Sequence, residues 1–581
     1  MKNKARHFKI WEENMTDLTK SPYNLTIAEI NFIKNKVTNM PLSAKIGQLF
    51  FVIGEDEDKK DLTKFIQKYQ PGGIMYRPDK AQKLQREIAV SQKASQMPLF
   101  IAANLEAGGN GLLTEGTWFG RPLQVAATND EQNAYNLGDV SGYEAKQVGG
   151  NMAFAPIVDL DLNFRNPIMN VRTFGSNKER VIKMSDAQIK ALNANHVIPV
   201  AKHFPGDGVD ERDQHLLSSI NSLSTDKWME SYGQIYRHLI QNGLPAIMIA
   251  HIMQPAWERR LQPGIENKDL RPASTSKLLT DGLLRTVLHF NGLTITDATP
   301  MIGYNAILPR SEALPATINA GIDMILFNKD IDEDYRFVTA SVKSGRISMT
   351  RLDEAVTRII ATKVAQGVMD TENNLCEPAS PDIDLKLSAH KKMAKKVAQE
   401  SVTLVKDRDK LLPITPEKYP RVRLVVLGDT DDGGFKEGGK VTTKFKEKLE
   451  GKGFKVTVFD RKNLDFKEVF AGGVQYEKEQ FDLAFYVANV ETASNQTTTR
   501  LDWIHLMAAD APWFMKSIPT VFVSTCNPYH LFDIPMVSTY INAYTGNDVT
   551  IDALLEKMMG HNKFTGQSPV DPFCGQFETH L

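Results

Sequence analysis

The stretch from Lys202 to His215 gathers side chains that could move a proton or hold a polar substrate. It opens with Lys202 and His203, and it closes with Asp213 two residues before His215. A carboxylate two residues from a histidine on a loop can bind one imidazole nitrogen, which fixes the tautomer and raises the basicity of the ring. The other nitrogen is then left to transfer a proton. The plain structural alternative is a solvated polar loop with a capping aspartate.

A second candidate group, Asp297, follows the apolar run 293–296. A carboxylate at the end of a buried strand faces a pocket, and with the Asp213–His215 pair it supplies an anion beside a proton donor or acceptor. That combination suits displacement at an acetal carbon, in which Asp297 attacks the anomeric centre while the pair protonates the leaving oxygen. A lysine at a strand end can also form a Schiff base, so Lys202 leaves an aldolase open as an alternative.

Eight short runs in the first two thirds of the chain would position these residues. The runs are apolar throughout, which suits strands buried on both faces of a parallel sheet. Amphipathic stretches such as 275–289 and 350–366 predict helices. Eight strands alternating with helices over about 320 residues predict an α/β fold of the (β/α)₈ (TIM) barrel type. The runs are 49–53, 73–76, 99–103, 152–155, 197–201, 246–250, 293–296 and 323–327.

Polar residues follow or close four of these runs. They are Asn104, Lys202 with His203, His251 and Asp297. In a barrel of this type the C-terminal strand ends share one face, and that face carries the active site. Each residue alone could be a satisfied polar cap, but four strand ends of this kind predict convergence on one pocket.

A second α/β pattern follows a stretch rich in Pro, Asn, Asp and Glu at 371–385. Its predicted strands are 423–427, 455–459, 483–488, 520–524 and 537–541. We expect a helical preface over 1–40, the catalytic barrel over 41–370, a linker over 371–390 and a smaller α/β domain, an αβα sandwich, over 391–581. No glycine-rich dinucleotide or P-loop signature occurs, so a nucleotide site there has no support.

The composition excludes several classes of function. The 581 residues carry 69 Lys+Arg against 70 Asp+Glu, so no net field draws nucleic acid or an anionic membrane. Three widely spaced cysteines (Cys376, Cys526 and Cys574) are too few for a disulfide framework, and no cluster has metal-ligand spacing. We expect neither metal nor cofactor. The sequence has no apolar stretch typical of a signal peptide or a membrane span, so we expect a soluble, cytoplasmic protein. The oligomeric state stays open.

The motifs around these residues resemble those of glycoside hydrolase family 3, in its two-domain β-N-acetylglucosaminidase branch. KHFPGDG at 202–208 with DQH at 213–215 is similar to the family's KHFPGHG and DxH. Further segments match the family in the same order. They are N…FAPIVD at 151–159, RTFG at 172–175, AHI at 250–252 with Pro255, PASTS at 272–276 and TDA at 296–298. ESVTLVK at 400–406 and NPY at 527–529 match more weakly.

The resemblance implies a retaining, double-displacement glycosidase without a cofactor. It would release terminal β-linked N-acetylhexosamine, either N-acetylglucosamine or a variant of it, from an amino-sugar glycoside, with a cell-wall fragment as one candidate. Asp297 would be the nucleophile, His215 the acid/base and Asp213 the residue that orients it. The residues expected to hold the sugar are Asn104, Arg172, Lys202, His203 and Met301.

Three departures from the family pattern affect the sugar site. Asn104 stands where the family has the aspartate of its DQEGG strand end, an arginine usually found after those glycines is absent, and Asp207 replaces the second histidine of KHFPGHG. Asn104 loses a charge and gains donors, so we expect an altered sugar preference. Two alternatives to hydrolysis remain. One is phosphorolysis, because a histidine acid/base repels phosphate less than a glutamate would, and the other is a sugar-binding barrel without turnover.

Overall fold

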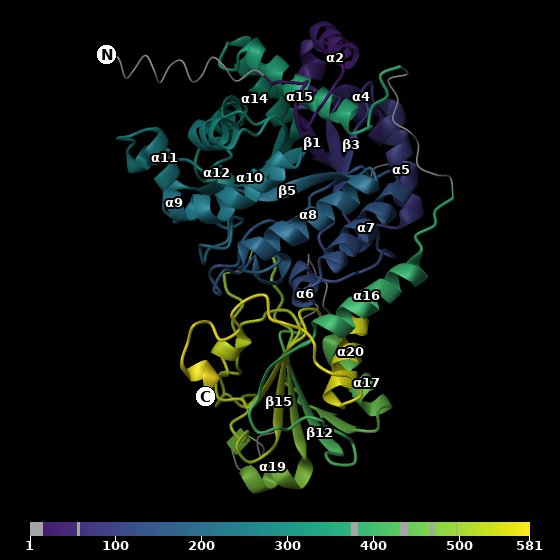
Figure 1. Cartoon of the computed structure of the whole chain (residues 1–581), viewed down its shortest axis with the longest axis vertical. Coiled ribbons are helices and arrows are strands. Elements are labelled where there is room, and N and C mark those ends of the chain that lie inside the picture. The colour runs from purple at the N-terminus through teal and green to yellow at the C-terminus, as the bar shows by residue number, and fades with distance from the viewer. Residues whose placement is uncertain are drawn as a thin grey trace. The chain divides into compact units, whose positions relative to one another are not determined.

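The computed structural model describes residues 16–54, 59–372, 382–429, 440–464, 469–470, 472–495 and 497–581 (Figure 1). Cys376, the first fifteen residues of the expected preface and part of the expected linker lie outside them. The chain forms two compact units. The first contains 1–117, 135–160 and 178–387, and the second contains 118–134, 161–177 and 388–581. The domain boundaries drawn from the sequence stay predictions.

Eight parallel strands form the barrel of the first unit, in the order β10-β1-β2-β3-β4-β5-β7-β9. A parallel bridge between Ile295 and Met324 brings β9 beside β10, so the ring nearly closes. Every strand overlaps one of the eight predicted runs, and the (β/α)₈ barrel is confirmed. The strands are β1 (Phe50–Ile53), β2 (Gly73–Met75), β3 (Phe100–Ala103), β4 (Met152–Ala153), β5 (Ile198–Phe204), β7 (Ala246–Ile249), β9 (Leu293–Thr296) and β10 (Ile325–Leu326).

The strands are apolar on both faces because the barrel has an interior and an outer layer of helices. Phe100 and Ala102 of β3 belong to a core cluster that draws on seven of the eight strands, whereas Leu99 and Ile101 pack in a second cluster with residues of the surrounding helices. Inside the barrel the ring of Phe51 stacks on that of Phe100, with centroids 6.0 Å apart. Side chains therefore fill the barrel, and only its ends can carry a site.

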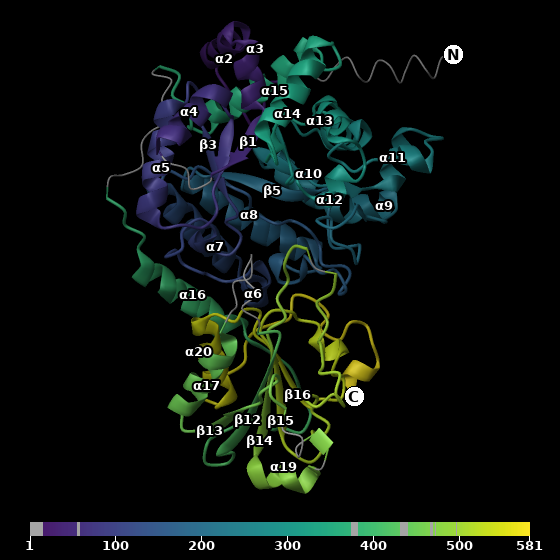
Figure 2. The same ribbon diagram turned by 180° about the vertical axis from the view of Figure 1, so that it is seen from behind.

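Helices follow each strand and surround the barrel (Figures 1 and 2). The helix predicted at 350–366 is confirmed as α15 (Met349–Ala365). The remaining α-helices of this unit are α2 (Ile27–Asn39), α3 (Leu42–Gln48), α4 (Lys59–Tyr69), α5 (Ala81–Ala94), α7 (Glu131–Gln147), α8 (Lys178–Ala194), α9 (Thr225–Trp228), α10 (Gln234–Gln241), α11 (Pro255–Leu261), α12 (Ile302–Asn305), α13 (Arg310–Asn319) and α14 (Ile331–Lys343). Short elements are β6 (Ser219–Ile220), β8 (Ile252–Met253), η1 (Gly109–Gly111), η3 (Met229–Gly233) and η4 (Asn267–Asp269).

The helix predicted at 275–289 differs from the expectation. It is η5 (Leu278–Val287), a π-helix, and it begins three residues later. The preceding segment is tied to strand ends instead, because Ala273 and Ser274 donate their backbone N–H groups to the carbonyls of Ile252 and Ala250, at 2.9 and 3.1 Å. The PASTS motif therefore forms a loop against β7 and β8 rather than a helical turn.

A buried ion cluster holds β9 and β10 together at their amino ends. The carboxylate of Asp323 accepts from Arg285 and Arg351, each at 2.9 Å, and from Arg358 at 3.1 Å. The Oδ2 atom of Asp323 also accepts from the hydroxyl of Thr294 at 2.9 Å. Burial raises the pKa of Asp323, but the three guanidinium groups outweigh it and lower the pKa to about 2. The cluster lies at the amino end of the barrel, where it serves the packing of β9 against β10.

The second unit is a six-stranded sheet in the order β11-β16-β15-β14-β12-β13. Its strands are β11 (Thr403–Asp407), β12 (Arg421–Leu427), β13 (Lys455–Val458), β14 (Leu483–Ala488), β15 (Thr520–Ser524) and β16 (Thr539–Asn542). All pairs are parallel except β11 with β16. Helices α17 (Val441–Gly451) and α20 (Asp548–Met558) pack on one face (Figure 2). Further elements are α6 (Pro122–Ala127), α16 (Leu387–Ser401), α19 (Val474–Gln480), η2 (Asn170–Arg172), η6 (His530–Phe532) and η7 (Glu578–His580).

Candidate active site

The polar residues expected at strand ends lie at the carboxyl end of the barrel. Asn104 follows β3, Lys202 and His203 lie near the carboxyl end of β5, His251 follows β7 and Asp297 follows β9. Hydrogen bonds join several of them. The Lys202 ammonium donates to Asn104 Oδ1 at 3.0 Å, and His251 Nε2 donates to the carbonyl of Ala298, the residue after Asp297, at 3.1 Å. The carboxyl end of a barrel is where such enzymes carry their chemistry.

Asp297 is a buried carboxylate held by two amide donors. Asp297 is only 9% exposed. Oδ1 accepts the backbone N–H of Ala298 at 2.7 Å, and Oδ2 accepts the side-chain amide of Gln214 at 3.2 Å. Burial raises the pKa of Asp297, but His203, His251, His215 and the Ala298 N–H together lower it below its ordinary value. Asp297 is therefore an anion at neutral pH, as a nucleophile must be.

The Asp213–His215 pair forms as the spacing predicts. Asp213 Oδ1 lies 2.6 Å from His215 Nδ1 and also accepts the backbone N–H of His215 at 2.9 Å. A carboxylate only accepts, so Nδ1 carries the proton and Nε2 is left for proton transfer. The Asp213 side chain is fully buried while that of His215 is 24% exposed, so the imidazole is the member of the pair that a substrate can reach.

A second Asp–His pair was not expected from the spacing. Asp159 Oδ2 lies 2.7 Å from His203 Nδ1, although the two residues are 44 positions apart. Asp159 Oδ1 also accepts the backbone N–H of Asp207 at 2.7 Å. His203 is thereby fixed with Nδ1 protonated and Nε2 left for a ligand. The signal available in the sequence was the FAPIVD segment, which places Asp159 just beyond β4.

Lys202 is neutralised by a carboxylate that sequence reasoning gave no role. Its ammonium lies 2.7 Å from Glu106 Oε1, and both side chains are buried. Glu106 stands two residues beyond Asn104, so Lys202 has a carboxylate partner although position 104 carries no charge. A buried, ion-paired ammonium has no lone pair for attack on a carbonyl, which counts against the aldolase alternative.

The loop between β5 and the Asp213–His215 pair is fixed by buried aromatic residues. Trp228 Nε1 donates to the carbonyl of Pro205 at 2.7 Å, and the hydroxyl of Tyr232 donates to the carbonyl of Asp207. Gly206 has a φ of 120°, and a Cβ there would lie 2.3 Å from the Tyr232 ring. Only glycine fits this position, so the PG step of the KHFPGDG motif is required by the backbone and the packing.

His251 contacts the backbone beside Asp297 as a neutral ring. Because Nε2 donates to the Ala298 carbonyl, Nδ1 is the acceptor for the hydroxyl of Ser274 at 2.8 Å. Burial lowers the pKa of His251 to about 4, so the ring is uncharged at neutral pH. The PASTS loop thus reaches the carboxyl end of the barrel through Ser274.

Two of the expected sugar-binding residues do not lie at the end of a barrel strand. Met301 is buried at the start of α12, where its N–H donates to the carbonyl of Ala298 at 3.1 Å. It therefore lies on the segment that follows Asp297. Arg172 ends η2, in the segment 161–177 that groups with the second unit. Its sugar-binding role stays a prediction.

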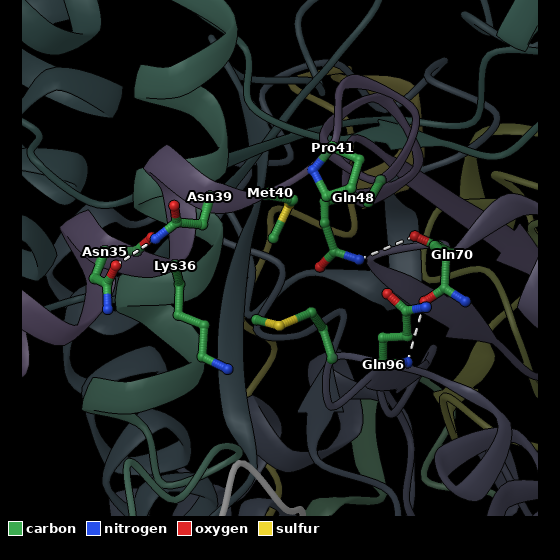
Figure 3. A pocket seen from close by; sticks show the side chains of 10 residues that line it. Asn35, Lys36, Asn39, Met40, Pro41, Gln48, Gln70 and Gln96 are labelled. Carbon is green, nitrogen blue, oxygen red and sulfur yellow. Dashed lines mark hydrogen bonds between the residues drawn. The ribbon is translucent and has the colours of Figure 1, made fainter.

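A pocket of about 310 Å³ lies at the other end of the barrel (Figure 3). Gln48, Gln70 and Gln96 line it, and they precede β1, β2 and β3. Gln48 Nε2 donates to the carbonyl of Gln70 at 2.9 Å, and Gln70 Oε1 accepts the N–H of Gln96 at 3.1 Å. These amides hydrogen-bond to backbone groups at the amino end of the barrel. None of the residues proposed for catalysis lines this pocket.

The described residues contain no group of three or more His, Cys, Asp or Glu side chains placed to bind a metal ion. Within the described residues neither Cys526 nor Cys574 forms a disulfide. None of the helices within the described ranges is both long enough and apolar enough to cross a membrane.

Comparison with known proteins decides the family. Residues 41–362 match the N-terminal domain of glycosyl hydrolase family 3. The chain belongs to this family. The resemblance drawn from the motifs is therefore confirmed, and the chain is a family 3 glycosidase with a carbohydrate substrate.

Several known proteins resemble this chain over nearly all of its length. A beta-N-acetylglucosaminidase/beta-glucosidase of Cellulomonas fimi is 41% identical over 576 residues, which cover 98% of this chain and 100% of that protein. A solved structure of beta-glucoside phosphorylase BglX is 41% identical, with a TM-score of 0.89 over 97% of this chain and 99% of that one. A second structure of that phosphorylase, bound to 2FGlc, is 42% identical with a TM-score of 0.88 over 96% and 99%.

Proposed function

We propose that this family 3 enzyme removes a terminal β-linked N-acetylglucosaminyl or glucosyl unit by double displacement, through a covalent adduct on Asp297. The observation that carries the proposal is the joint placement of an ionised, buried Asp297 and the Asp213–His215 pair, which a hydrogen bond from Gln214 links to the nucleophile at 3.2 Å. The name of the Cellulomonas fimi relative, which is 41% identical, supports both sugars.

In the first step an oxygen of Asp297 bonds to the anomeric carbon as the bond to the leaving oxygen breaks. His215 Nε2 gives its proton to that oxygen, so the aglycone departs as a neutral alcohol. Asp213, buried against Nδ1, stabilises the charged ring before the transfer and keeps Nε2 directed outward. The ring is then neutral, with a lone pair on Nε2.

In the second step an acceptor attacks the same carbon and releases Asp297 as a carboxylate. If the acceptor is water, His215 Nε2 takes up its proton, which restores the enzyme. Two inversions leave the product in the β configuration. Sugar hydroxyls would be held by Asn104, Lys202, His203 and Met301.

Inorganic phosphate is the second candidate acceptor. The 41% identity to a beta-glucoside phosphorylase over 97% of this chain favours it. The chemistry agrees, because a histidine acid/base is neutral after the first step, whereas a glutamate there would be an anion that repels phosphate. Phosphate is already ionised and needs no general base to attack.

A panel of p-nitrophenyl β-glycosides, each tested with and without phosphate, tests this proposal. Release of nitrophenol from the β-N-acetylglucosaminide or the β-glucoside, with a β-configured free sugar or sugar phosphate as product, is the expected result. The ratio of sugar phosphate to free sugar identifies the acceptor. Tight sugar binding with no nitrophenol released from any member would instead establish a binding protein.

A further inference from the structure

Gln214 stands between the two residues of the acid/base pair and reaches the nucleophile. It is 1% exposed. Its Nε2 group donates to Asp297 Oδ2 at 3.2 Å, and its Oε1 atom accepts the backbone N–H of His251 at 2.9 Å. Only the oxygen of an amide can accept from an N–H group, so the NH₂ end must face the carboxylate. The backbone beyond β7 therefore fixes which end of the amide meets Asp297.

Two backbone hydrogen bonds reinforce this contact. Ile302 donates its N–H to the carbonyl of His215, and Gly303 donates to the carbonyl of Gln214, each at 3.1 Å. Both donors belong to α12, which begins five residues beyond Asp297. The loop that carries the acid/base is thus joined to the nucleophile and to the segment after it by three hydrogen bonds.

A double displacement depends on the spacing between the nucleophile and the acid/base. In retaining glycosidases with two carboxyl groups that separation is about 5–5.5 Å, and small misplacements of reacting groups cost large factors in rate. A histidine on a loop cannot hold such a spacing by itself, since loops are more mobile than the strands they connect. A further contact must hold the loop at a fixed distance from Asp297.

We propose that Gln214 is a positioning residue, which holds the loop that carries His215 at a fixed position relative to Asp297. The inference rests on the proposed function, because it assigns Gln214 a part in the same double displacement. Its amide stabilises the anionic carboxylate before attack, and the same N–H can bond the carbonyl oxygen of the glycosyl ester afterwards. Gln214 makes no bond to the reacting carbon and transfers no proton.

Gln214→Met keeps the side-chain length and removes both hydrogen bonds. We expect kcat/KM for an aryl glycoside to fall about tenfold to a hundredfold, the usual value of a hydrogen bond to a charged group. The loss should lie in kcat rather than in KM. The matched control is Gln254→Met. Gln254 is also fully buried, with an amide that donates to the Leu223 carbonyl at 2.7 Å and accepts the Trp257 N–H at 2.8 Å. Gln254→Met should therefore lower the thermal stability without lowering kcat to the same extent.

Gln214→Glu tests the role through the pH dependence of kcat/KM, which a packing defect alone would not change. The titratable groups already facing Asp297 are His203 from β5, His251 from the segment beyond β7, and His215 from the loop. A carboxylate at 214 adds a negative charge beside Asp297 and raises its pKa. The acid limb of the kcat/KM profile should therefore move to higher pH, by roughly one unit or more, relative to the wild type.

Circular dichroism establishes that each variant is folded before rates are compared. Equal kcat for Gln214→Met and Gln254→Met, or an acid limb that Gln214→Glu leaves in place, would overturn the positioning role. If Gln214→Glu does not fold, the two methionine variants decide the question. A wild-type enzyme that turns over glycosides without any adduct on Asp297 would refute the proposed function instead, so the two failures are distinguishable.

Discussion

Changing Asn104 to aspartate tests how the end of β3 selects the sugar. Asn104 is exposed, and its Oδ1 atom is occupied by the Lys202 ammonium at 3.0 Å, so its Nδ2 group is the end left for a ligand. That end can only donate hydrogen bonds. The charge of Lys202 is already balanced by Glu106 at 2.7 Å. Asn104→Asp therefore adds a carboxylate whose charge is available to accept from sugar hydroxyls.

The magnitude follows from the change in hydrogen-bond type. A hydrogen bond to a charged group contributes about 1 kcal/mol more than a neutral one, so two hydroxyls gain about 2 kcal/mol, or roughly thirtyfold in kcat/KM. We expect the wild type to act on a simple aryl β-N-acetylglucosaminide, but weakly. Asn104→Asp should raise kcat/KM on the plain N-acetylglucosaminide.

Initial rates of nitrophenol release from aryl β-N-acetylglucosaminide and aryl β-glucoside, measured for both enzymes, provide the assay. Glu106→Gln is the matched control, because it removes the charge that balances Lys202 and should lower activity on both sugars. A wild type that is already efficient on N-acetylglucosaminide, and that Asn104→Asp makes slower, would refute the reasoning.

Three further predictions concern the acid/base, the fold and the loop. His215→Ala should slow glycosides with basic leaving groups far more than activated aryl glycosides, and equal losses in steady-state rates would exclude His215 as the acid. Asp323→Asn should cost about 3–5 kcal/mol in urea unfolding, because buried guanidinium groups lose their counter-charge. In the wild type this stabilisation is present above about pH 4 and is lost as the pH falls toward the folded pKa of about 2, a dependence that the variant should lack. Gly303→Ala would place a Cβ 2.5 Å from the Gln214 carbonyl, so activity should fall more than the melting temperature does.

The barrel could be predicted because each strand is a short apolar run between polar or glycine-rich segments. β11 was not predicted, since Thr403–Asp407 is an edge strand with only partial burial and the sequence TLVKD has little apolar character. The bounds of η5 were also missed, because the backbone contacts of the PASTS loop depend on strands that lie far from it in sequence.

The candidate site was predicted where spacing alone fixes a contact. Asp213 and His215 are two residues apart, so their pairing follows from local geometry. Asp159 and Glu106 could not be given a role from the sequence, because their partners His203 and Lys202 come from a different strand of the barrel. Gln214 was passed over because a glutamine carries no charge, and its contact with Asp297 exists only once two strand ends meet.

The most direct test of the account is to trap the intermediate on the wild-type enzyme with a 5-fluoro-glycoside and map the label by mass spectrometry. The account predicts one glycosyl unit on the peptide that contains Asp297. It also predicts that Asp297→Ala takes up no label and loses turnover by about 10³-fold or more. A label found reproducibly on another carboxylate, or turnover that persists in Asp297→Ala, would contradict the assignment of Asp297 as the nucleophile.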